Sequence, residues 1–291
     1  MTRSARYRQQ RATGTVLLLP GALWLIVLFV VPLGVMIAVS LGTTNIVNQP
    51  VYGWNPGNYS QVMHADYLQV VARTLVYAAI TTVLSLLVSY PVAYVIARYG
   101  GRAKGLLIGL ILLPWLVDYL IRIYAWVVLL SDQGVVNSLL HAIGMSGSPP
   151  VQFLNTPFAV IGGLVYGYFP FMVLPIYGTL EQLDGRLIEA GRDLYGSRAA
   201  TFRHVTWPLT RAAAGIGCLL VFLPVLGDFA TAQLLGGTST FMLGNLIATQ
   251  FLESGSPNIG AVLTVLLSAA LLIAIVVAGF VLGRRRLERI L

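Results

Sequence analysis

Long stretches of this chain contain no Asp, Glu, Lys or Arg, over lengths far greater than a helix of a soluble domain requires. They include residues 12–65, 74–97, 133–180 and 254–283. A helix that crosses a bilayer needs about 20 mostly apolar residues, so each stretch has room for at least one. The apolar residues form continuous runs and do not alternate with polar ones, which indicates helices rather than the strands of a barrel.

From these runs we predict an all-α membrane protein with six transmembrane helices. The predicted spans are about 15–41, 70–97, 105–130, 156–180, 209–235 and 258–283. The first could instead be a signal peptide, because a basic tail (residues 1–14) precedes it. Its apolar run continues past Pro32 to Leu41, which is longer than the usual apolar region of about 7–15 residues. We therefore expect an uncleaved span.

The composition agrees with a membrane protein, and the basic residues set its orientation. The chain is 57% hydrophobic and 10% charged. Of its 18 Lys and Arg, 16 lie in the basic tail, in the connection 98–104, in the segment 186–211 and in the C-terminal segment 284–291. The other three connections contain none, so the positive-inside rule predicts that both termini are cytoplasmic. The net charge of +8 then reflects topology and anionic lipid, and we expect no nucleic-acid partner.

The chain lacks the residues that catalysis or a metal site would need. Cys218 is the only cysteine, and the three histidines lie on separate connections without ligand spacing. Lys104 is the only lysine and does not belong to a phosphate-binding Gly-x-x-x-x-Gly-Lys-Ser/Thr loop. No Gly-x-Ser-x-Gly elbow occurs either. We therefore expect no metal, no cofactor and no enzymatic activity of the chain's own.

The longest charged connection, residues 184–207, has an amphipathic pattern. Apolar or small residues recur at i, i+3, i+4 and i+7, which predicts one stripe of a short helix: Leu187, Ala190, Gly191 and Leu194. The charged side chains that should face away from this stripe are Arg186, Glu189 and Asp193. Composition alone is compatible with an amphipathic helix lying on lipid or with a solvated linker.

The same loop contains signals for a bend between two helices. Gly196 can end the first helix in a left-handed conformation, and Ser197 can cap a second one that carries Phe202 and Val205. Pro208 is tolerated in the first turn of the span that follows. The predicted product is a helix, an elbow and a second helix across one membrane face.

The residue order in this loop resembles the signature loop of ABC importer permeases. Glu189-Ala190-Gly191 is followed by Gly196 and then by Pro208-Leu209, where that family has a Glu-Ala-Ala triplet, a glycine and a close such as apolar-x-Leu-Pro. Gly191 replaces the third alanine, and Tyr195 takes the usual place of the glycine. Other segments look like the spermidine/putrescine branch of the family: 120–126, 163–166, 169–172, 226–229, 235–237 and 244–247.

The resemblance implies the type I ABC importer permease fold, in which this loop forms a coupling helix that docks on a cytoplasmic ATPase. It also implies a second permease subunit, expected as a heterodimer, two ATPase subunits that bind the ATP, and a periplasmic substrate-binding protein, all at the bacterial inner membrane. We assign ATPase contact to six residues of the loop: Glu189, Ala190, Gly191, Asp193, Gly196 and Phe202.

The predicted function is half of the translocation pathway for spermidine or putrescine. The alternative in the same class is a permease for another small cationic or opine-like solute. A stand-alone secondary transporter or channel is a different class, and it would be expected to supply more coupling-ion or selectivity residues than this chain has. Membrane lipid is the remaining expected partner.

Three charges lie well inside predicted spans and away from their cytoplasmic and outer ends, where they are costly and therefore candidates for the substrate pathway. At a rise of 1.5 Å per residue, Asp118 lies about 21 Å, Arg122 about 27 Å and Asp228 about 30 Å from the cytoplasmic ends of their spans. Asp118 and Arg122 are four residues apart and can neutralise one another. Asp228 has no cation nearby in the sequence, which makes it the better candidate for substrate contact.

Aromatic side chains near these charges suit a polyamine, since its ammonium groups need carboxylates and aromatic faces. The aromatic candidates close to the charges of the third span are Trp115, Tyr119 and Tyr124. An aromatic belt at the outer interface is the alternative explanation for them. Prolines within four of the spans are expected to kink or open their helices: Pro91, Pro114, Pro170, Pro175 and Pro224.

Overall fold

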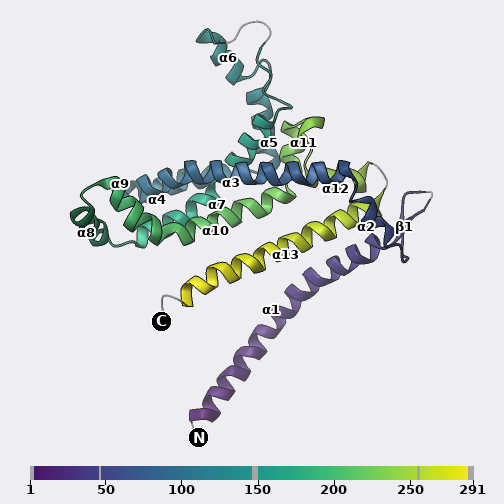
Figure 1. Ribbon diagram of the computed structural model, residues 1–291, viewed down its shortest axis with the longest axis horizontal. Helices are drawn as coiled ribbons and strands as arrows, with labels where there is room; N and C mark the ends of the chain where they lie inside the picture. The colour runs from purple at the N-terminus through teal and green to yellow at the C-terminus, as the bar shows by residue number, and fades with distance from the viewer. Residues whose placement is uncertain (1–2, 46, 146–149, 254–255, 288–291) are drawn as a thin grey trace. The chain divides into compact units, whose positions relative to one another are not determined.

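The computed structural model describes residues 3–45, 47–145, 150–253 and 256–287, and most of these residues are helical (Figure 1). The long helices are α1 (Arg3–Ser40), α3 (Ala65–Tyr99), α7 (Pro157–Gln182), α10 (Trp207–Gly227) and α13 (Pro257–Leu287). The shorter helices are α2 (Gly57–Gln61), α4 (Lys104–Leu112), α5 (Tyr119–Leu130), α6 (Val135–Ala142), α8 (Gly185–Tyr195), α9 (Arg198–Thr201), α11 (Ala230–Leu235) and α12 (Leu243–Leu252). Single 3-10 turns occur at Gly101–Ala103, Leu113–Leu116 and Thr238–Thr240.

Among the described residues, six segments are long and apolar enough to cross a membrane, which confirms the predicted all-α fold with six spans. They are Leu19–Ser40, Ala65–Tyr99, Tyr119–Ala142, Pro157–Gln182, Arg198–Gly227 and Pro257–Val277. The basic tail is not separate from the first span, because α1 already begins at Arg3. The C-terminal segment continues α13 as far as Leu287. Residues 1–2 and 288–291 of the two predicted basic termini lie outside the described residues.

The third predicted span, 105–130, is not one helix. α4 ends at Leu112, a 3-10 turn follows, and Val117 is extended before α5 begins at Tyr119. Pro114 lies in this turn, where it cannot donate a helical hydrogen bond. The Asp118 carboxylate then caps the N-terminus of α5. The candidate spanning segment that starts here is Tyr119–Ala142, which differs from the predicted span at both ends.

The fifth predicted span, 209–235, is also divided. α10 runs without interruption from Trp207 to Gly227, although Pro224 lies inside it. Asp228 is extended and α11 starts two residues later, at Ala230. The chain thus breaks its helical backbone beside Asp228, the single acidic residue of this segment.

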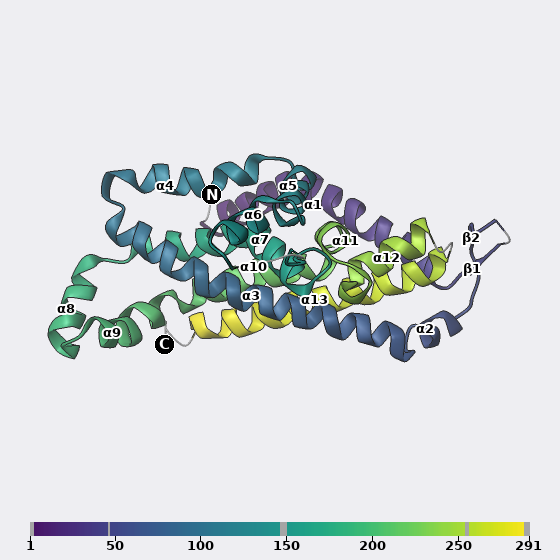
Figure 2. The ribbon, with the colours of Figure 1, turned by 90° about the horizontal axis from the view of Figure 1, so that it is seen from above.

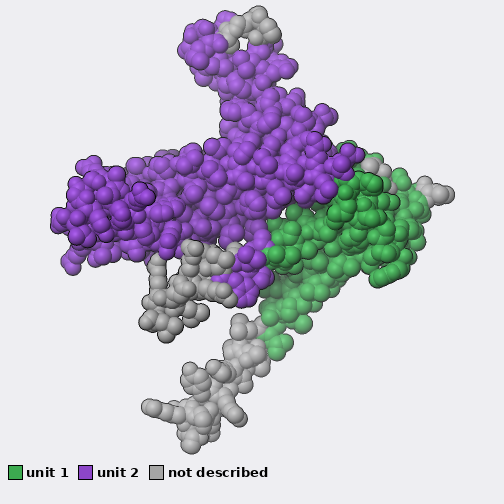
Figure 3. All heavy atoms as spheres, in the orientation of Figure 1, with its two compact units in different colours: residues 1–64, 247–273 green, residues 65–246, 274–291 purple. Residues whose placement is uncertain are grey.

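The chain divides into two compact units, which Figure 3 distinguishes by colour. Unit 1 comprises residues 1–64 and 247–273. Within it, the short strands β1 (Thr43–Thr44) and β2 (Pro50–Val51) pair in an antiparallel ladder just after α1. The buried amide of Asn58 donates to the carbonyl oxygens of Ser40 and Gly42, at 2.8 Å each, and so closes the end of α1.

Unit 2 comprises residues 65–246 and 274–291 and contains the candidate functional residues. Its core is the packing of α3, α7 and α10 on one another (Figures 1 and 2). Side chains with almost no exposed surface fill this core, among them Leu164, Met172, Ile176, Leu180 and Val221. At one end of these helices the chain continues into α8 and α9, and α11 packs on α5 and α7.

Candidate functional site

The 184–207 loop folds as the predicted helix, elbow and helix. Asp184 caps α8 by accepting a hydrogen bond from the Arg186 amide at 3.0 Å. Gly196 ends α8 in the left-handed region with φ +66°, as predicted from the sequence. Ser197 then caps α9 through a bond from the Ala200 amide at 3.2 Å, which was also predicted. A π-helical turn, Phe202–Thr206, leads directly into α10.

The inward face of α8 differs by one residue from the predicted stripe. Ile188 and Gly191 are buried, whereas Leu187 is 49% and Leu194 is 75% exposed. Ala190 is exposed as well. The apolar stripe therefore has its proposed spacing, but most of it faces outward. The tight contact of α8 with the following helical segment is made through Gly191. Arg186, Glu189 and Asp193 are exposed, as expected.

Gly191 sets how closely α8 approaches the next helical segment. A Cβ atom placed on it would lie 2.9 Å from Cγ2 of Val205 and 3.0 Å from Cγ2 of Thr201. Carbon atoms rarely approach so closely, so an alanine here would force the two segments apart. This contact gives a physical reason for glycine at the third position of the triplet, where the resemblance leads one to expect alanine.

Two basic residues hold the chain just before α8. The guanidinium of Arg98, at the end of α3, donates from both terminal nitrogens to the carbonyl oxygen of Leu183, at 3.2 Å each. Lys104, at the start of α4, forms an ion pair with Glu181 at 2.9 Å. The connection between α3 and α4 is thereby tied to the end of α7, where the loop begins.

Phe202 joins the other end of the loop to α3. Its ring meets Tyr90 edge-on at 5.5 Å and Tyr94 at 6.4 Å between ring centroids. Tyr90 also contacts Trp207 at 5.6 Å, and its hydroxyl lies 2.6 Å from that of Thr210. Phe202 thus packs against α3 while 37% of its surface stays exposed, and its role in ATPase contact stays a prediction.

Asp228 is the centre of the second cluster. Its side chain is 6% exposed and accepts hydrogen bonds from the hydroxyls of Tyr168, at 3.0 Å, and Tyr119. Thr231 donates to it twice, from its backbone N–H at 2.9 Å and from its hydroxyl at 3.2 Å. These donors come from α5, α7 and α11, so one carboxylate joins three helices. They are all neutral, and within the described residues no Lys or Arg forms an ion pair with Asp228.

The predicted neutralisation of Asp118 by Arg122 is not observed. Asp118 is exposed and accepts from the amides of Leu120 at 2.9 Å and Ile121 at 3.4 Å, because it stands at the N-terminus of α5 and not within a continuous helix. The Arg122 guanidinium lies over the Tyr119 ring, 5.5 Å from its centroid. The cation–π partner of Tyr119 is therefore a residue of the chain itself.

The other aromatic candidates are not all near Asp228. Trp115 packs edge-on against Phe171 at 5.4 Å, and Phe171 lies 6.2 Å from the Tyr168 ring. Trp115 is thus connected to the carboxylate through two intervening rings. Tyr124 is 56% exposed and makes no contact with the cluster among the interactions of the described residues.

Several of these residues were missed by the sequence analysis. Thr231 follows Asp228 by three positions, the spacing of a side-chain cap, and this pattern could have been recognised. Lys104 and Glu181 lie at the predicted ends of neighbouring spans and could have been paired by charge. Tyr168 carries no such signal, because nothing local relates it to Asp228. Within the described ranges, no group of three His, Cys, Asp or Glu residues is arranged to hold a metal ion.

Comparison with known proteins identifies the family. Residues 89–289 match the family described as binding-protein-dependent transport system inner membrane component. The chain is 38% identical over 267 residues to the spermidine/putrescine transport system permease protein PotB of Haemophilus influenzae, covering 91% of this chain and 93% of the relative. The PotB protein of Escherichia coli is 35% identical over 245 residues, which cover 84% of this chain and 89% of the relative.

The fold agrees with this assignment. A solved bacterial alginate ABC transporter, in complex with an alginate pentasaccharide-bound periplasmic protein, contains a chain that superposes with a TM-score of 0.76 at 15% identity. The superposition covers 96% of both chains, and at this identity it supports the type I fold alone. The chain belongs to the family of inner membrane components of binding-protein-dependent transport systems, the permease subunits of ABC importers.

Proposed function

We propose that this chain forms half of the translocation pathway of an ATP-driven importer for polyamines of the spermidine and putrescine type. The observation that carries the proposal is the similarity to polyamine permeases at 35–38% identity, which extends over 84–91% of the chain. In this proposal a periplasmic binding protein delivers the solute, and the chain pairs with a second permease subunit and two ATPase subunits. The ATP is bound by those partners, and both termini of this chain are cytoplasmic.

The 184–207 loop is the proposed contact with the ATPase. Its outward stripe of Leu187, Ala190 and Leu194 is apolar and exposed, and Glu189 and Asp193 lie beside it. An apolar stripe flanked by charges suits a helix that docks in a groove of a soluble partner. The loop is also tied to the membrane helices at both of its ends, so a displacement of α8 would be passed on to them.

Asp228 is the proposed centre of the polyamine pathway in this subunit. A carboxylate stabilised by neutral hydroxyls keeps its charge available to an ammonium group, and the rings of Tyr119, Tyr168 and Trp115 lie in the same region. The polyamine would approach Asp228 from the side that its present donors leave open. One hydrogen bond from a hydroxyl to the carboxylate would then be replaced by one from an ammonium group. Arg122 already occupies one face of Tyr119, which leaves the Tyr168 and Trp115 side for the cation.

The experiment that tests the proposal is uptake into proteoliposomes. The complete importer, reconstituted with ATP enclosed on the ATPase side, is supplied with binding protein and radiolabelled spermidine or putrescine. ATP-dependent accumulation that unlabelled polyamine abolishes is the expected result. Accumulation of neither polyamine by a complex whose ATPase is active would refute the proposed solute and leave the family assignment unaffected.

A second candidate is a permease for another small cationic or opine-like solute. It is retained because the binding protein contributes to the choice of solute, and Asp228 would attract any compact cation. Competition of the polyamine signal by a panel of amino acids, opines and quaternary amines separates the two candidates. A competitor that is itself accumulated, and outcompetes spermidine, would favour the second.

A further inference from the structure

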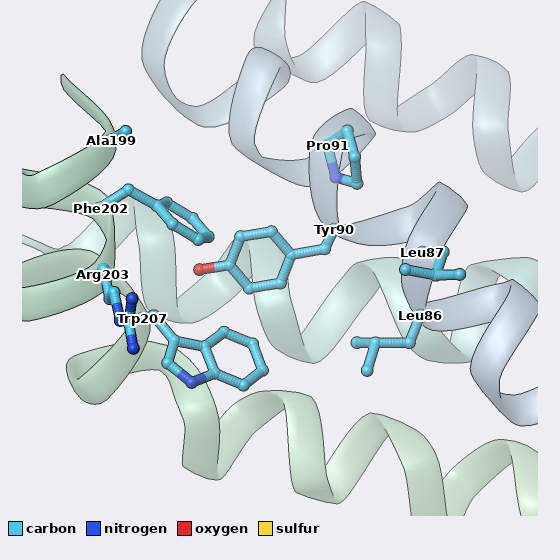
Figure 4. Close-up of a pocket in the computed structure, with 8 residues that line it drawn as sticks. All are labelled: Leu86, Leu87, Tyr90, Pro91, Ala199, Phe202, Arg203 and Trp207. Carbon is cyan, nitrogen blue, oxygen red and sulfur yellow. The ribbon is translucent and has the colours of Figure 1, made fainter.

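Unit 2 contains an open cavity of about 660 Å³ between α3 and the segment that joins α9 to α10 (Figure 4). We name it the aromatic groove. Its lining residues are Leu86, Leu87, Tyr90, Pro91, Ala199, Phe202, Arg203 and Trp207. The surface of the groove is mostly apolar, and the Tyr90 hydroxyl is already bonded to Thr210. Both Phe202 and Leu87 retain exposed surface, 37% and 63%, so the groove is accessible from outside the unit.

Arg203 is the only charged residue of the lining. It is exposed, and among the interactions of the described residues it has neither a hydrogen bond nor an ion pair. In Figure 4 its guanidinium lies next to Trp207, on the side of the groove opposite Leu86 and Leu87. The groove is therefore amphipathic along its length, with a cation at one end and aliphatic side chains at the other.

The charged and aliphatic ends of the aromatic groove are separated along the direction of α3. Leu87 precedes Arg98 by eleven residues, which corresponds to about 16 Å of helix. Half of the hydrocarbon core is about 15 Å thick. The aliphatic end thus lies about one leaflet away from the charged end of α3, and Arg203 lies on the side of that charged end.

We propose that the aromatic groove binds an anionic phospholipid from the leaflet on the side of the 184–207 loop. One acyl chain lies along Leu87, Tyr90 and Phe202, and the phosphate pairs with Arg203. Charge favours an anionic over a zwitterionic headgroup: Arg198 and Arg211 flank Arg203, and no Asp or Glu occurs from residue 194 to 227. Each basic residue near the surface contributes about a five-fold preference for anionic lipid.

Lipid in this position would contact the coupling path directly. Phe202 and Tyr90 both line the groove, and the contact between their rings joins the 184–207 loop to α3. An acyl chain held between them would stiffen that contact, and an empty groove would leave it loose. A π-helical turn forms one wall, and such turns are frequent at functional sites.

The test uses the full chain, co-expressed with its partner subunits and placed in phosphatidylcholine nanodiscs. The probe is a phosphatidylglycerol with a photoreactive diazirine in one acyl chain, and labelled peptides are located by mass spectrometry. We expect labelling of Leu86, Leu87 or Trp207 that unlabelled phosphatidylglycerol displaces at least five-fold more effectively than phosphatidylcholine. Arg203→Gln is expected to lower this preference about five-fold and to leave residual labelling.

A second variant tests the groove itself. Leu87→Trp fills it and is expected to abolish labelling there, whereas Leu84→Trp changes a half-exposed residue of the same helix outside the lining and is expected to have no effect. Equal displacement by both lipids, or labelling unchanged in Leu87→Trp, would overturn the proposal. So would efficient cross-linking of Leu87→Cys to the second permease subunit, since a protein would then occupy the groove.

Discussion

Substitution of Gly191 by alanine restores the residue that the family pattern leads one to expect, and the structure predicts that it harms this protein. The new Cβ would lie 2.9 Å from the Val205 side chain and 3.0 Å from that of Thr201. Neither neighbour can yield freely, because Thr201 is buried and both lie on a short helical segment fixed to α10. The expected response is a displacement of α8 away from this segment.

The magnitude follows from two opposing terms. Overpacking by one methyl group costs about 1–3 kcal/mol. Alanine is favoured over glycine inside a helix by about 1 kcal/mol, which offsets part of this cost. The net loss is thus at most about 2 kcal/mol, which corresponds to a melting temperature lower by up to about 8 °C for a chain of this size. Transport should fall further, because the displaced helix carries the proposed ATPase contact.

The assay combines thermal unfolding of the purified complex with ATP-dependent uptake in proteoliposomes. Gly185→Ala is the matched control, because a Cβ on Gly185, also in α8, meets nothing within 4 Å. Val205→Ala removes the closer obstacle, so the double variant is expected to recover part of the uptake that Gly191→Ala loses. Wild-type stability and uptake in Gly191→Ala, with no coupling to Val205, would refute the packing argument.

Four further substitutions probe the remaining contacts. Asp228→Asn is expected to reduce polyamine uptake more than ten-fold. Tyr168→Phe removes one of several donors to the Asp228 carboxylate at a cost of about 1.5–3 kcal/mol, and should reduce uptake less and stability more. Equal uptake by the wild type and both variants would contradict a charge requirement. Lys104→Met should change stability by less than about 1 kcal/mol in thermal unfolding, since its ion pair with Glu181 is partly exposed. Arg98→Met removes charged hydrogen bonds to a half-buried carbonyl and is expected to uncouple ATPase activity from uptake; an unchanged ratio of solute imported to ATP hydrolysed would contradict it.

Element type was predictable from the sequence because the bilayer imposes it. Long apolar runs are costly to expose to water and cannot leave their backbone unbonded in lipid, so six spans followed from length and hydropathy. The interruptions were not predictable to the same degree. Pro114 was expected to distort its helix, but the sequence did not show that Asp118 would start a new one. A proline such as Pro170 or Pro224 stays inside a continuous helix, so proline alone does not decide where a span breaks.

The local features of the 184–207 loop were predictable, and its packing was not. Gly196 and Ser197 act on backbone groups within four residues, so their conformations depend on nearby sequence. The inward face of α8 depends on what lies against it, and the pattern around Ile188 fits two registers that differ by one residue. The donors to Asp228 illustrate the same limit, since Tyr168 is 60 residues away and only the packing of α7 on α10 brings it close.

The two faces of α8 explain how one short helix can serve as a mechanical link. Its inner face is joined to the π-helical turn through Gly191 and is too tightly packed to slide, and its outer stripe is free to bind. The chain before it is fixed by Arg98 and the chain after it by Phe202, and both of these contacts lie on α3. A force applied to the outer face therefore reaches α3 at two points about one to two turns apart and α10 directly through the continuous backbone. In the proposed coupling, such a connection would transmit rotation of α8 to both helices, which a single flexible attachment could not do.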